Sequence, residues 1–155
     1  MEYCKNISSP IGNVEVVTSE EFITTVSIVN KRKPDSTTFP HCLLLCEKQL
    51  QEYFEGKRSF FDLPLQIKGT PFQEKVWTAL LNIPYGSTLS YKELAKRIGK
   101  PKATRAIGNA NSKNPICIII PCHRVINSNG NPGGYSSGKG QETKQWLLNH
   151  ETQYF

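Results

Sequence analysis

The residues best suited to chemistry lie in one short run near the C-terminal end of the chain. Cys122 follows a stretch of three isoleucines and Pro121, and His123 and Arg124 come directly after it. The thiolate is the nucleophilic form of cysteine, and neighbouring imidazole and guanidinium groups increase its population. We therefore predict that Cys122 is a nucleophile.

Glu151 is the candidate for a third group at this site. A carboxylate commonly orients an imidazole that takes a proton from a thiol, so Cys122, His123 and Glu151 form a possible relay. Because neighbouring residues of an extended chain point to opposite sides, we expect a water molecule to link Cys122 to His123. Two simpler interpretations remain open: a structural histidine at His123, and a solvent-exposed helix end at Glu151.

The other cysteines do not suggest a disulfide framework. The chain has five cysteines at irregular spacing, and an odd, irregular set is typical of reduced thiols. Cys117 lies inside an apolar run and is predicted to be part of the core. Cys42 and Cys46 lie beside His41 on a predicted helix, but no second pair of ligands is evident, so we predict no bound metal.

The charge is unevenly distributed along the chain. Residues 1–66 have 7 Lys or Arg and 9 Asp or Glu, a net charge of −2, whereas residues 67–155 have 12 and 4, a net charge of +8. A basic half favours a polyanionic partner, most simply nucleic acid. A basic surface with no anionic partner is the simpler alternative.

Nothing in the sequence indicates a membrane protein. No apolar run reaches the ~20 residues that span a bilayer, and the first residues lack the basic and apolar segments of a secretory signal. We expect an intracellular protein, in the cytoplasm or, in a eukaryote, the nucleus.

The N-terminal third reads as a small sheet with one helix. Residues 14–18 and 22–29 are rich in β-branched side chains and predict two strands, and residues 10–13 predict a turn before the first. Residues 41–54 have apolar positions at the helical period, and Gly56 ends that helix. Residues 62–69 are a plausible linker.

The rest of the chain is predicted to be more helical. Residues 72–83 and 91–98 predict two helices, and Ser90 with Glu93 forms a capping box for the second. A third helix is expected from about Pro101 to Ala110, so that the last two form a helix-turn-helix. A glycine-rich loop over residues 127–138 precedes a final helix, 141–150, which directs Trp146, Leu147 and Leu148 inward.

The second helix of this pair is lined with small residues: Ala103, Ala106, Gly108 and Ala110. Reading base edges in the major groove requires long polar side chains. Small residues instead allow a helix backbone to approach DNA closely, or to pack against a neighbouring helix. Both interpretations can be correct, with DNA on one face of this helix and the neighbouring helix on the opposite face.

Taken in order, the motifs of this chain resemble those of the O6-alkylguanine-DNA alkyltransferases. The resemblance is strong over residues 69–151 and weak over residues 1–66. Its elements are PFQEKVW at 71–77, IPYG at 83–86, SY at 90–91, RAIG at 105–108, NP at 114–115, IPCHRV at 120–125, GYS at 134–136, WLL at 146–148 and HE at 150–151.

The resemblance implies an α+β fold with two domains. Residues 1–66 would form a small ribonuclease-H-like domain of sheet and helix, and residues 67–155 a helical, winged-helix-like DNA-binding catalytic domain. It also implies a DNA repair activity in which the alkyl group of O6-alkylguanine, and less readily O4-alkylthymine, moves irreversibly to Cys122. Each molecule would react once, and no cofactor is required because the lesion is the activated donor.

Roles at the reaction centre follow from the same resemblance. His123 would deprotonate Cys122 through water, Glu151 would hold His123, Asn114 would brace the active-site turn, and the Tyr91 hydroxyl would donate to the departing guanine. The substrate pocket would be lined by Val125, Tyr135 and Ser136.

The implied partner is double-stranded DNA, bound through the minor groove by a monomer. The target base would be flipped out of the helix, with Arg105 filling the space that it leaves. Further DNA contacts are expected from Lys92, Lys100, Ser128 and Gln73. Two other functions are open at this point: a non-catalytic module that binds DNA lesions, and a cysteine hydrolase that uses Cys122 and His123.

Overall fold

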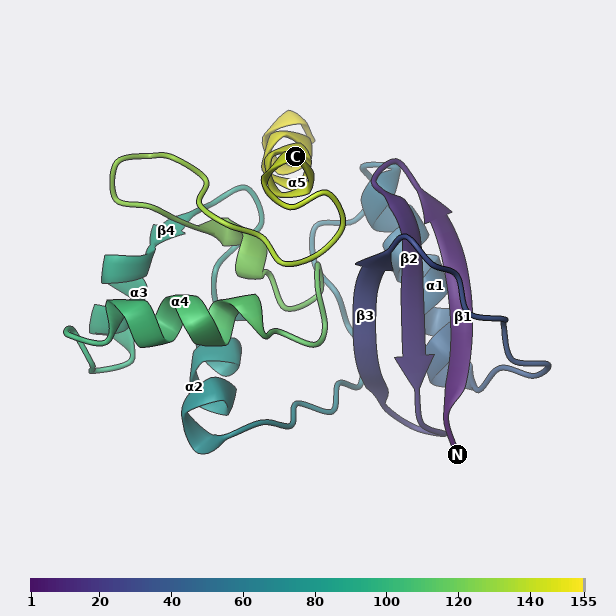
Figure 1. The fold of residues 1–155 in the computed structure, drawn as a ribbon. Coiled ribbons are helices and arrows are strands. Elements are labelled where there is room, and N and C mark those ends of the chain that lie inside the picture. The colour runs from purple at the N-terminus through teal and green to yellow at the C-terminus, as the bar shows by residue number, and fades with distance from the viewer. Residues whose placement is uncertain (155) are drawn as a thin grey trace.

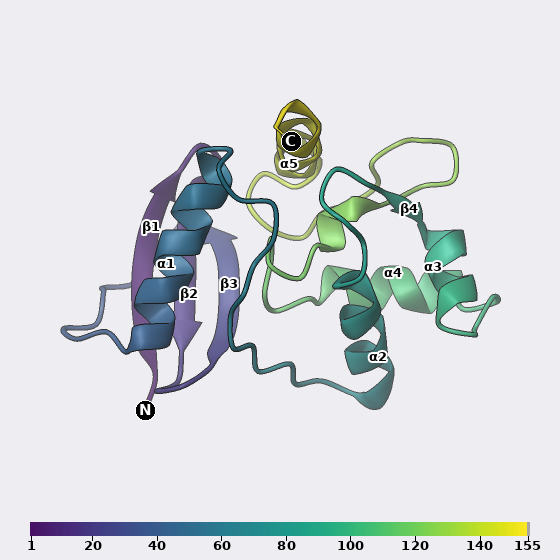
Figure 2. The same cartoon turned by 180° about the vertical axis from the view of Figure 1, so that it is seen from behind.

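The N-terminal part of the computed structural model, which describes residues 1–154, is a sheet covered by one helix. Strands β1 (Tyr3–Ser9), β2 (Gly12–Thr18) and β3 (Ile23–Val29) form an antiparallel sheet in the order β1-β2-β3. Helix α1 (His41–Phe54) lies across one face of it, behind the sheet in Figure 1 and in front of it in Figure 2. The bounds of α1 and the turn at residues 10–11 are as predicted.

Strand β1 is absent from the sequence prediction. Its seven residues, YCKNISS, are largely polar and give little alternation, so the signal for a strand is weak. The structure pairs it with β2 in register from Tyr3 opposite Thr18 to Ser9 opposite Gly12. Hydrogen bonding to β2, which is a tertiary contribution, therefore decides its conformation.

The second part of the chain is built on three helices, α2 (Pro71–Leu80), α3 (Tyr91–Arg97) and α4 (Thr104–Ser112). Thr70 caps α2, and Ser90 caps α3 through the predicted capping box with Glu93. The indole Nε1 of Trp77 donates to the carbonyl oxygen of Ala110 at 2.9 Å, so α2 is bonded directly to α4. Ala110 is thus buried while Ala106 is exposed, and α4 uses its small residues on both faces.

The prediction that α4 starts near Pro101 is wrong. Gly99 adopts a positive φ of 74°, and the turn that follows runs through Lys100 to Ala103, whose amide bonds to the Lys100 carbonyl. The helical hydrogen-bond ladder begins only with Ile107 N to Ala103 O at 2.9 Å. A left-handed glycine followed by proline ends one helix more readily than it starts the next.

The C-terminal helix α5 (Gln141–Gln153) is seen end-on between the two parts of the molecule in both Figure 1 and Figure 2. Leu147 is fully buried as expected, but Trp146 and Leu148 are only partly buried. The positions that α5 buries include Thr143, Lys144, His150 and Glu151. This helix therefore directs polar groups inward. No helix within residues 1–154 is long and apolar enough to span a membrane.

Strand β3 joins the sheet to the second part of the chain. Val26 exchanges hydrogen bonds with the segment at 115–117, where Cys117 N donates to Val26 O at 2.8 Å. Ile28 N donates to Ser137 Oγ at 2.9 Å, and Gly138 N donates to Ile28 O at 3.1 Å. The outer edge of β3 thus holds two loops that are far apart in the sequence.

The Ser90 cap provides a test of the fold. Ser90→Ala removes the side-chain oxygen that accepts from the Glu93 amide, and we expect the free energy of unfolding to fall by about 1 kcal/mol. Urea unfolding followed by circular dichroism measures this. Thr78→Ala, at an exposed position inside α2, is the control and should change stability by about 0.5 kcal/mol or less; equal losses in the two variants would contradict the role of the cap.

Candidate active site

Cys122 is placed by a tight turn that precedes it. Ile120 N bonds to Ile116 O at 3.0 Å, and Ile118 has a positive φ of 72°, which is rare for a β-branched residue. Asn114 holds both ends of this turn, since its Nδ2 donates to Ile120 O at 2.8 Å and its Oδ1 accepts from Ile116 N at 3.0 Å. Asn114 therefore bridges the two ends of the turn that precedes Cys122.

The Cys122 side chain lines a pocket between α3, α4 and the glycine-rich loop. The cavity has a volume of about 310 Å³, and its lining residues are Tyr91, Gly108, Asn111, Ser112, Cys122, Gly134, Tyr135 and Ser136. Of the predicted site residues, Tyr91, Tyr135 and Ser136 thus meet Cys122 at one cavity. Val125 does not line it; its side chain is buried and its carbonyl oxygen accepts a hydrogen bond from Lys144 at 2.6 Å.

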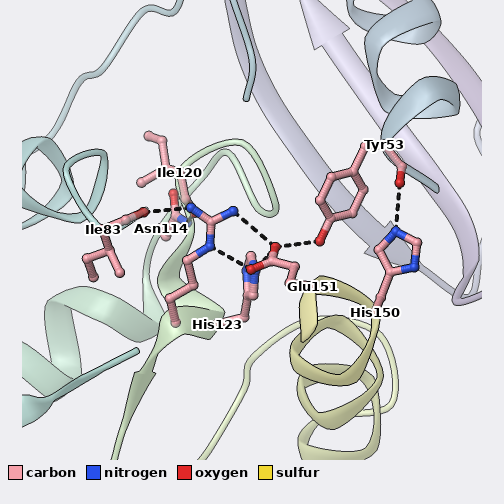
Figure 3. Close-up of polar contacts among 8 residues, drawn as sticks. Tyr53, Ile83, Asn114, Ile120, His123, His150 and Glu151 are labelled. Carbon is pink, nitrogen blue, oxygen red and sulfur yellow. Dashed lines mark hydrogen bonds and ion pairs between the residues drawn. The ribbon is translucent and has the colours of Figure 1, made fainter. Parts of the chain in front are cut away.

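Beside η1 (Cys122–Arg124), three side chains meet at the Glu151 carboxylate. His123 Nε2 lies 2.7 Å from Glu151 Oε2, and the Tyr53 hydroxyl donates to the same oxygen at 2.6 Å (Figure 3). Arg124 donates from Nε to Oε1 at 2.7 Å and from an Nη atom to Oε2 at 3.1 Å. Glu151 is only 3% exposed, so it is not a solvent-exposed helix end.

The expected extended conformation at Cys122 and His123 is wrong. Residues Cys122–Arg124 form a single 3-10 turn, in which consecutive side chains point in three directions. Arg124 consequently faces Glu151 and the carbonyl oxygen of Ile83, at 2.7 Å, and not the Cys122 thiol. The idea that this guanidinium assists the thiolate directly is therefore incorrect.

The buried groups have perturbed proton affinities. Burial alone would raise the pKa of Glu151, but the charge and hydrogen bonds of His123 and Arg124 override it and hold that pKa well below its usual range. Burial lowers the pKa of His123, against the opposing attraction of Glu151. The resting relay is therefore a neutral imidazole beside an ionised carboxylate.

The Cys122 thiol is protonated at rest. Its hydrogen bond with the Cys117 thiol and its burial raise its pKa, whereas Asn114 and Lys144 act in the opposite direction. Cys117 is a core residue as predicted, at 4% exposure, but its contact with Cys122 was not foreseen. A protonated thiol needs a base, and the Nδ1 atom of His123 has no hydrogen-bond partner within residues 1–154.

Lys144 is a site residue that sequence reasoning missed. It is fully buried, and its Nζ donates to the carbonyl oxygens of Val125 at 2.6 Å and Gly134 at 3.2 Å, with the Tyr91 hydroxyl at 3.5 Å. Burial lowers its pKa to about 8. The signal in the sequence is positional, because Lys144, Leu147 and Glu151 recur at the helical period and share one face of α5.

The candidate DNA contacts are placed separately from this relay. Lys92, Lys100, Arg105 and Ser128 are all exposed, on α3, α4 and the loops beside them. Gln73 instead completes the capping box of α2, where its Oε1 accepts from Thr70 N at 3.0 Å. Within residues 1–154 no three His, Cys, Asp or Glu side chains lie together as metal ligands would.

Comparison with known proteins agrees with this architecture. The family model for the 6-O-methylguanine DNA methyltransferase DNA-binding domain matches residues 71–153, and that for the ribonuclease-like domain of the same family matches residues 3–67. The chain belongs to the 6-O-methylguanine DNA methyltransferase family. Its fold is the α+β arrangement of that family, with a small N-terminal sheet domain and a C-terminal helical DNA-binding domain.

Individual members of the family are similar over nearly their whole length. The constitutive methylated-DNA–protein-cysteine methyltransferase of Bacillus subtilis is 43% identical, over 97% of this chain and 96% of its own. The methylated-DNA–protein-cysteine methyltransferase of Methanosarcina acetivorans is 44% identical, over 96% and 97%. The crystal structure of Mycobacterium tuberculosis O6-methylguanine methyltransferase superposes with a TM-score of 0.89 at 40% identity, covering 100% of this chain and 95% of that one.

The Glu151 carboxylate gives a prediction for stability. Glu151→Gln leaves the buried Arg124 charge without its counter-ion, and we expect a loss of about 3–5 kcal/mol in the free energy of unfolding at neutral pH. Because the folded-state pKa of Glu151 is depressed, its contribution is complete above the unfolded-state pKa of about 4.3 and is lost as the pH falls further. The difference in the free energy of unfolding between wild type and Glu151→Gln should therefore become smaller at acid pH.

Urea unfolding at a series of pH values measures both effects. Glu142→Gln, an exposed position on the same helix, is the matched control and should leave the profile unchanged. If the difference in the free energy of unfolding between wild type and Glu151→Gln stayed constant from neutral to acid pH, the depressed pKa of Glu151 would be contradicted.

Proposed function

We propose that this protein repairs DNA by transferring the alkyl group of O6-alkylguanine to Cys122, irreversibly and once per molecule. The observation that supports this most directly is the position of Cys122. Its thiol lies in a cavity beside the Tyr91 hydroxyl, and the next residue, His123, is bonded to a buried carboxylate. A nucleophile, a base and a donor for the leaving group therefore meet at one place.

The geometry supports the following proton path. The carboxylate of Glu151 accepts from Nε2–H of His123, so the neutral imidazole keeps its lone pair on Nδ1. Through one water molecule Nδ1 takes the proton of the Cys122 thiol. The imidazolium that forms is then stabilised by Glu151, as in other relays of nucleophile, base and orienting carboxylate.

The alkyl transfer itself is a displacement at saturated carbon. The Cys122 thiolate forms the S–C bond while the bond from carbon to O6 of guanine breaks, and the guanine leaves with the electron pair. The Tyr91 hydroxyl donates a hydrogen bond to the base as its negative charge develops, and Lys144, 3.5 Å from that hydroxyl, favours the donation. The lesion supplies the activated carbon, so the chemistry needs no cofactor, and the thioether product keeps Cys122 blocked.

DNA binding follows from family membership and from a solved relative. A crystal structure of the Mycobacterium tuberculosis relative in complex with DNA superposes with a TM-score of 0.87 at 42% identity, over 97% of this chain and 92% of that one. The target atom lies inside the base stack, so the nucleotide must be extruded. We assign this step to Arg105. Helix α4 would lie in the minor groove, with Ala106 facing the DNA backbone. Lys92, Lys100 and Ser128 would make further contacts with phosphates.

Other parts of the proposal rest on sequence and family alone. These are the boundary between residues 66 and 67, activity on O4-alkylthymine, a monomeric state, a DNA contact by Gln73 and a cytoplasmic location. A non-catalytic lesion-binding module would not require the buried relay behind Cys122. A hydrolase would require water to release the product, whereas a thioether is stable to hydrolysis.

Intact-protein mass spectrometry tests the central claim. After incubation with duplex DNA that contains O6-methylguanine, the protein should gain one methyl group per molecule, and peptide mapping should place it on Cys122. Cys122→Ala should gain none, and Cys117→Ala, which keeps the acceptor, is the matched control. Repeated turnover without a mass increase would support the hydrolase, and lesion binding without any reaction would support the non-catalytic module.

Arg105 can be separated from the chemistry by a choice of substrate. Because extrusion of the base is needed only in duplex DNA, Arg105→Ala should slow repair of the duplex about tenfold or more. The same variant should react with free O6-benzylguanine at a rate within about twofold of wild type. Lys48→Ala removes another exposed charge, from α1, and should change neither rate. Equal losses on both substrates for Arg105→Ala would contradict its role in flipping.

A further inference from the structure

One member of the cluster around Glu151 comes from the other domain. Tyr53 lies in the last turn of α1, 98 residues before Glu151, and its hydroxyl donates to Glu151 Oε2 at 2.6 Å (Figure 3). The side chain is fully buried. The N-terminal domain thus contributes a hydrogen bond to the carboxylate that orients His123.

We propose that Tyr53 is a positioning residue for alkyl transfer, acting through Glu151 on the proton affinity and orientation of His123. This rests on the roles proposed above for Cys122, His123 and Glu151. It extends the relay across the domain boundary, so that reactivity of the C-terminal domain depends on a group supplied by the N-terminal domain.

The geometry around Oε2 is the first argument. That single oxygen accepts from Tyr53 at 2.6 Å, from His123 at 2.7 Å and, more weakly, from an Nη atom of Arg124 at 3.1 Å, while Oε1 accepts from Arg124 Nε. The two short bonds to Oε2 fix the carboxylate plane and compete for the same electron density. Burial raises the pKa of the Tyr53 phenol, so the hydroxyl remains a donor at all ordinary pH values.

A second contact positions Tyr53 independently of its hydroxyl. The ring of His150, next to Glu151 in sequence, donates from Nε2 to the Tyr53 carbonyl oxygen at 2.7 Å (Figure 3). His150 also stacks on Trp146, with ring centroids 4.7 Å apart. The end of α1 is therefore held at two consecutive residues of α5, which makes the Tyr53–Glu151 distance a fixed property of the domain interface.

The expected direction of the effect follows from hydrogen bonding. A donor to a carboxylate stabilises its charge and weakens its attraction for another proton. Without the Tyr53 hydroxyl, Glu151 becomes more basic and retains the His123 proton more strongly, so the imidazole stays charged to higher pH. Since His123 must be neutral to accept the Cys122 proton, the rising limb of the pH–rate profile should move to higher pH.

The test is Tyr53→Phe in the full-length protein, with free O6-benzylguanine as the alkyl donor so that DNA binding plays no part. The rate of Cys122 alkylation is followed by intact mass across the pH range in which an imidazole titrates. Rates are normalised to the fraction of molecules that finally react. We expect the rising limb to be displaced to higher pH, with a loss of rate on its acid side that reaches about tenfold, the size of one hydrogen bond to a charged group.

A second variant gives the opposite displacement and retains the packing. Tyr53→3-fluorotyrosine, introduced site-specifically, keeps the ring and makes its hydroxyl a stronger donor, so the profile should move to lower pH. Tyr3→Phe is the matched control, because it removes a phenol hydroxyl from β1 of the same domain, where that hydroxyl is bonded to Glu20 and not to Glu151. It should leave the pH dependence unchanged.

The outcomes separate this inference from the proposed function. Unchanged profiles in both Tyr53 variants, or an equal displacement in Tyr3→Phe, would overturn the role of Tyr53 while alkylation of Cys122 stands. If Cys122→Ala were still alkylated by O6-benzylguanine, the proposed function itself would be wrong.

Discussion

A carboxylate buried away from water must be matched by donors, and in this protein that requirement links most of the structure. Glu151 is 3% exposed and its two oxygens accept from His123, Arg124 and Tyr53. Those donors belong to a 3-10 turn and to α1, and the acceptor belongs to α5. Removing one partner of a buried ion pair costs several kcal/mol, so these three elements are held in one arrangement.

The same surroundings disfavour the thiolate form of Cys122, the nucleophile proposed above. A buried, protonated thiol is a poor nucleophile, and Cys122 is such a thiol because Cys117 and its surroundings raise its pKa. In the proposed mechanism its reactivity therefore depends on Nδ1 of His123, whose orientation is set by Glu151. A protein whose cysteine is consumed by one reaction would benefit from this, since a free thiolate would react with oxidants and other electrophiles.

The N-terminal domain is part of the site through its sheet as well as through Tyr53. The outer edge of β3 binds the segment at 115–117 that leads into the active-site turn, and also the loop at 137–138 behind Tyr135 and Ser136. An unpaired strand edge offers donors and acceptors that must be satisfied. Here they hold the segment that leads to Cys122 and the loop that contributes Tyr135 and Ser136 to the pocket.

Local sequence signals predicted several elements correctly. The apolar period over residues 41–54 and the capping box of Ser90 with Glu93 depend on neighbours within one or two turns, and both helices begin where expected. The predicted start of the next helix at Pro101 was wrong, because glycine and proline occur in turns as well as at helix ends. The sequence alone did not distinguish these two uses at Gly99 and Pro101. Strand β1 was missed because a polar strand is specified by the partner to which it bonds.

The sequence by itself determined the candidate reactive group, the basic C-terminal half and the family, because these depend on residue identity and order. The tertiary structure decided which atoms meet: Arg124 faces Glu151 and not Cys122, Lys144 lies beneath Tyr91, and Tyr53 reaches Glu151 from 98 residues away. Such contacts have no local signature, since the distance between side chains on different elements is set by how the elements pack. The charge state of Cys122, which depends on burial, was decided in the same way.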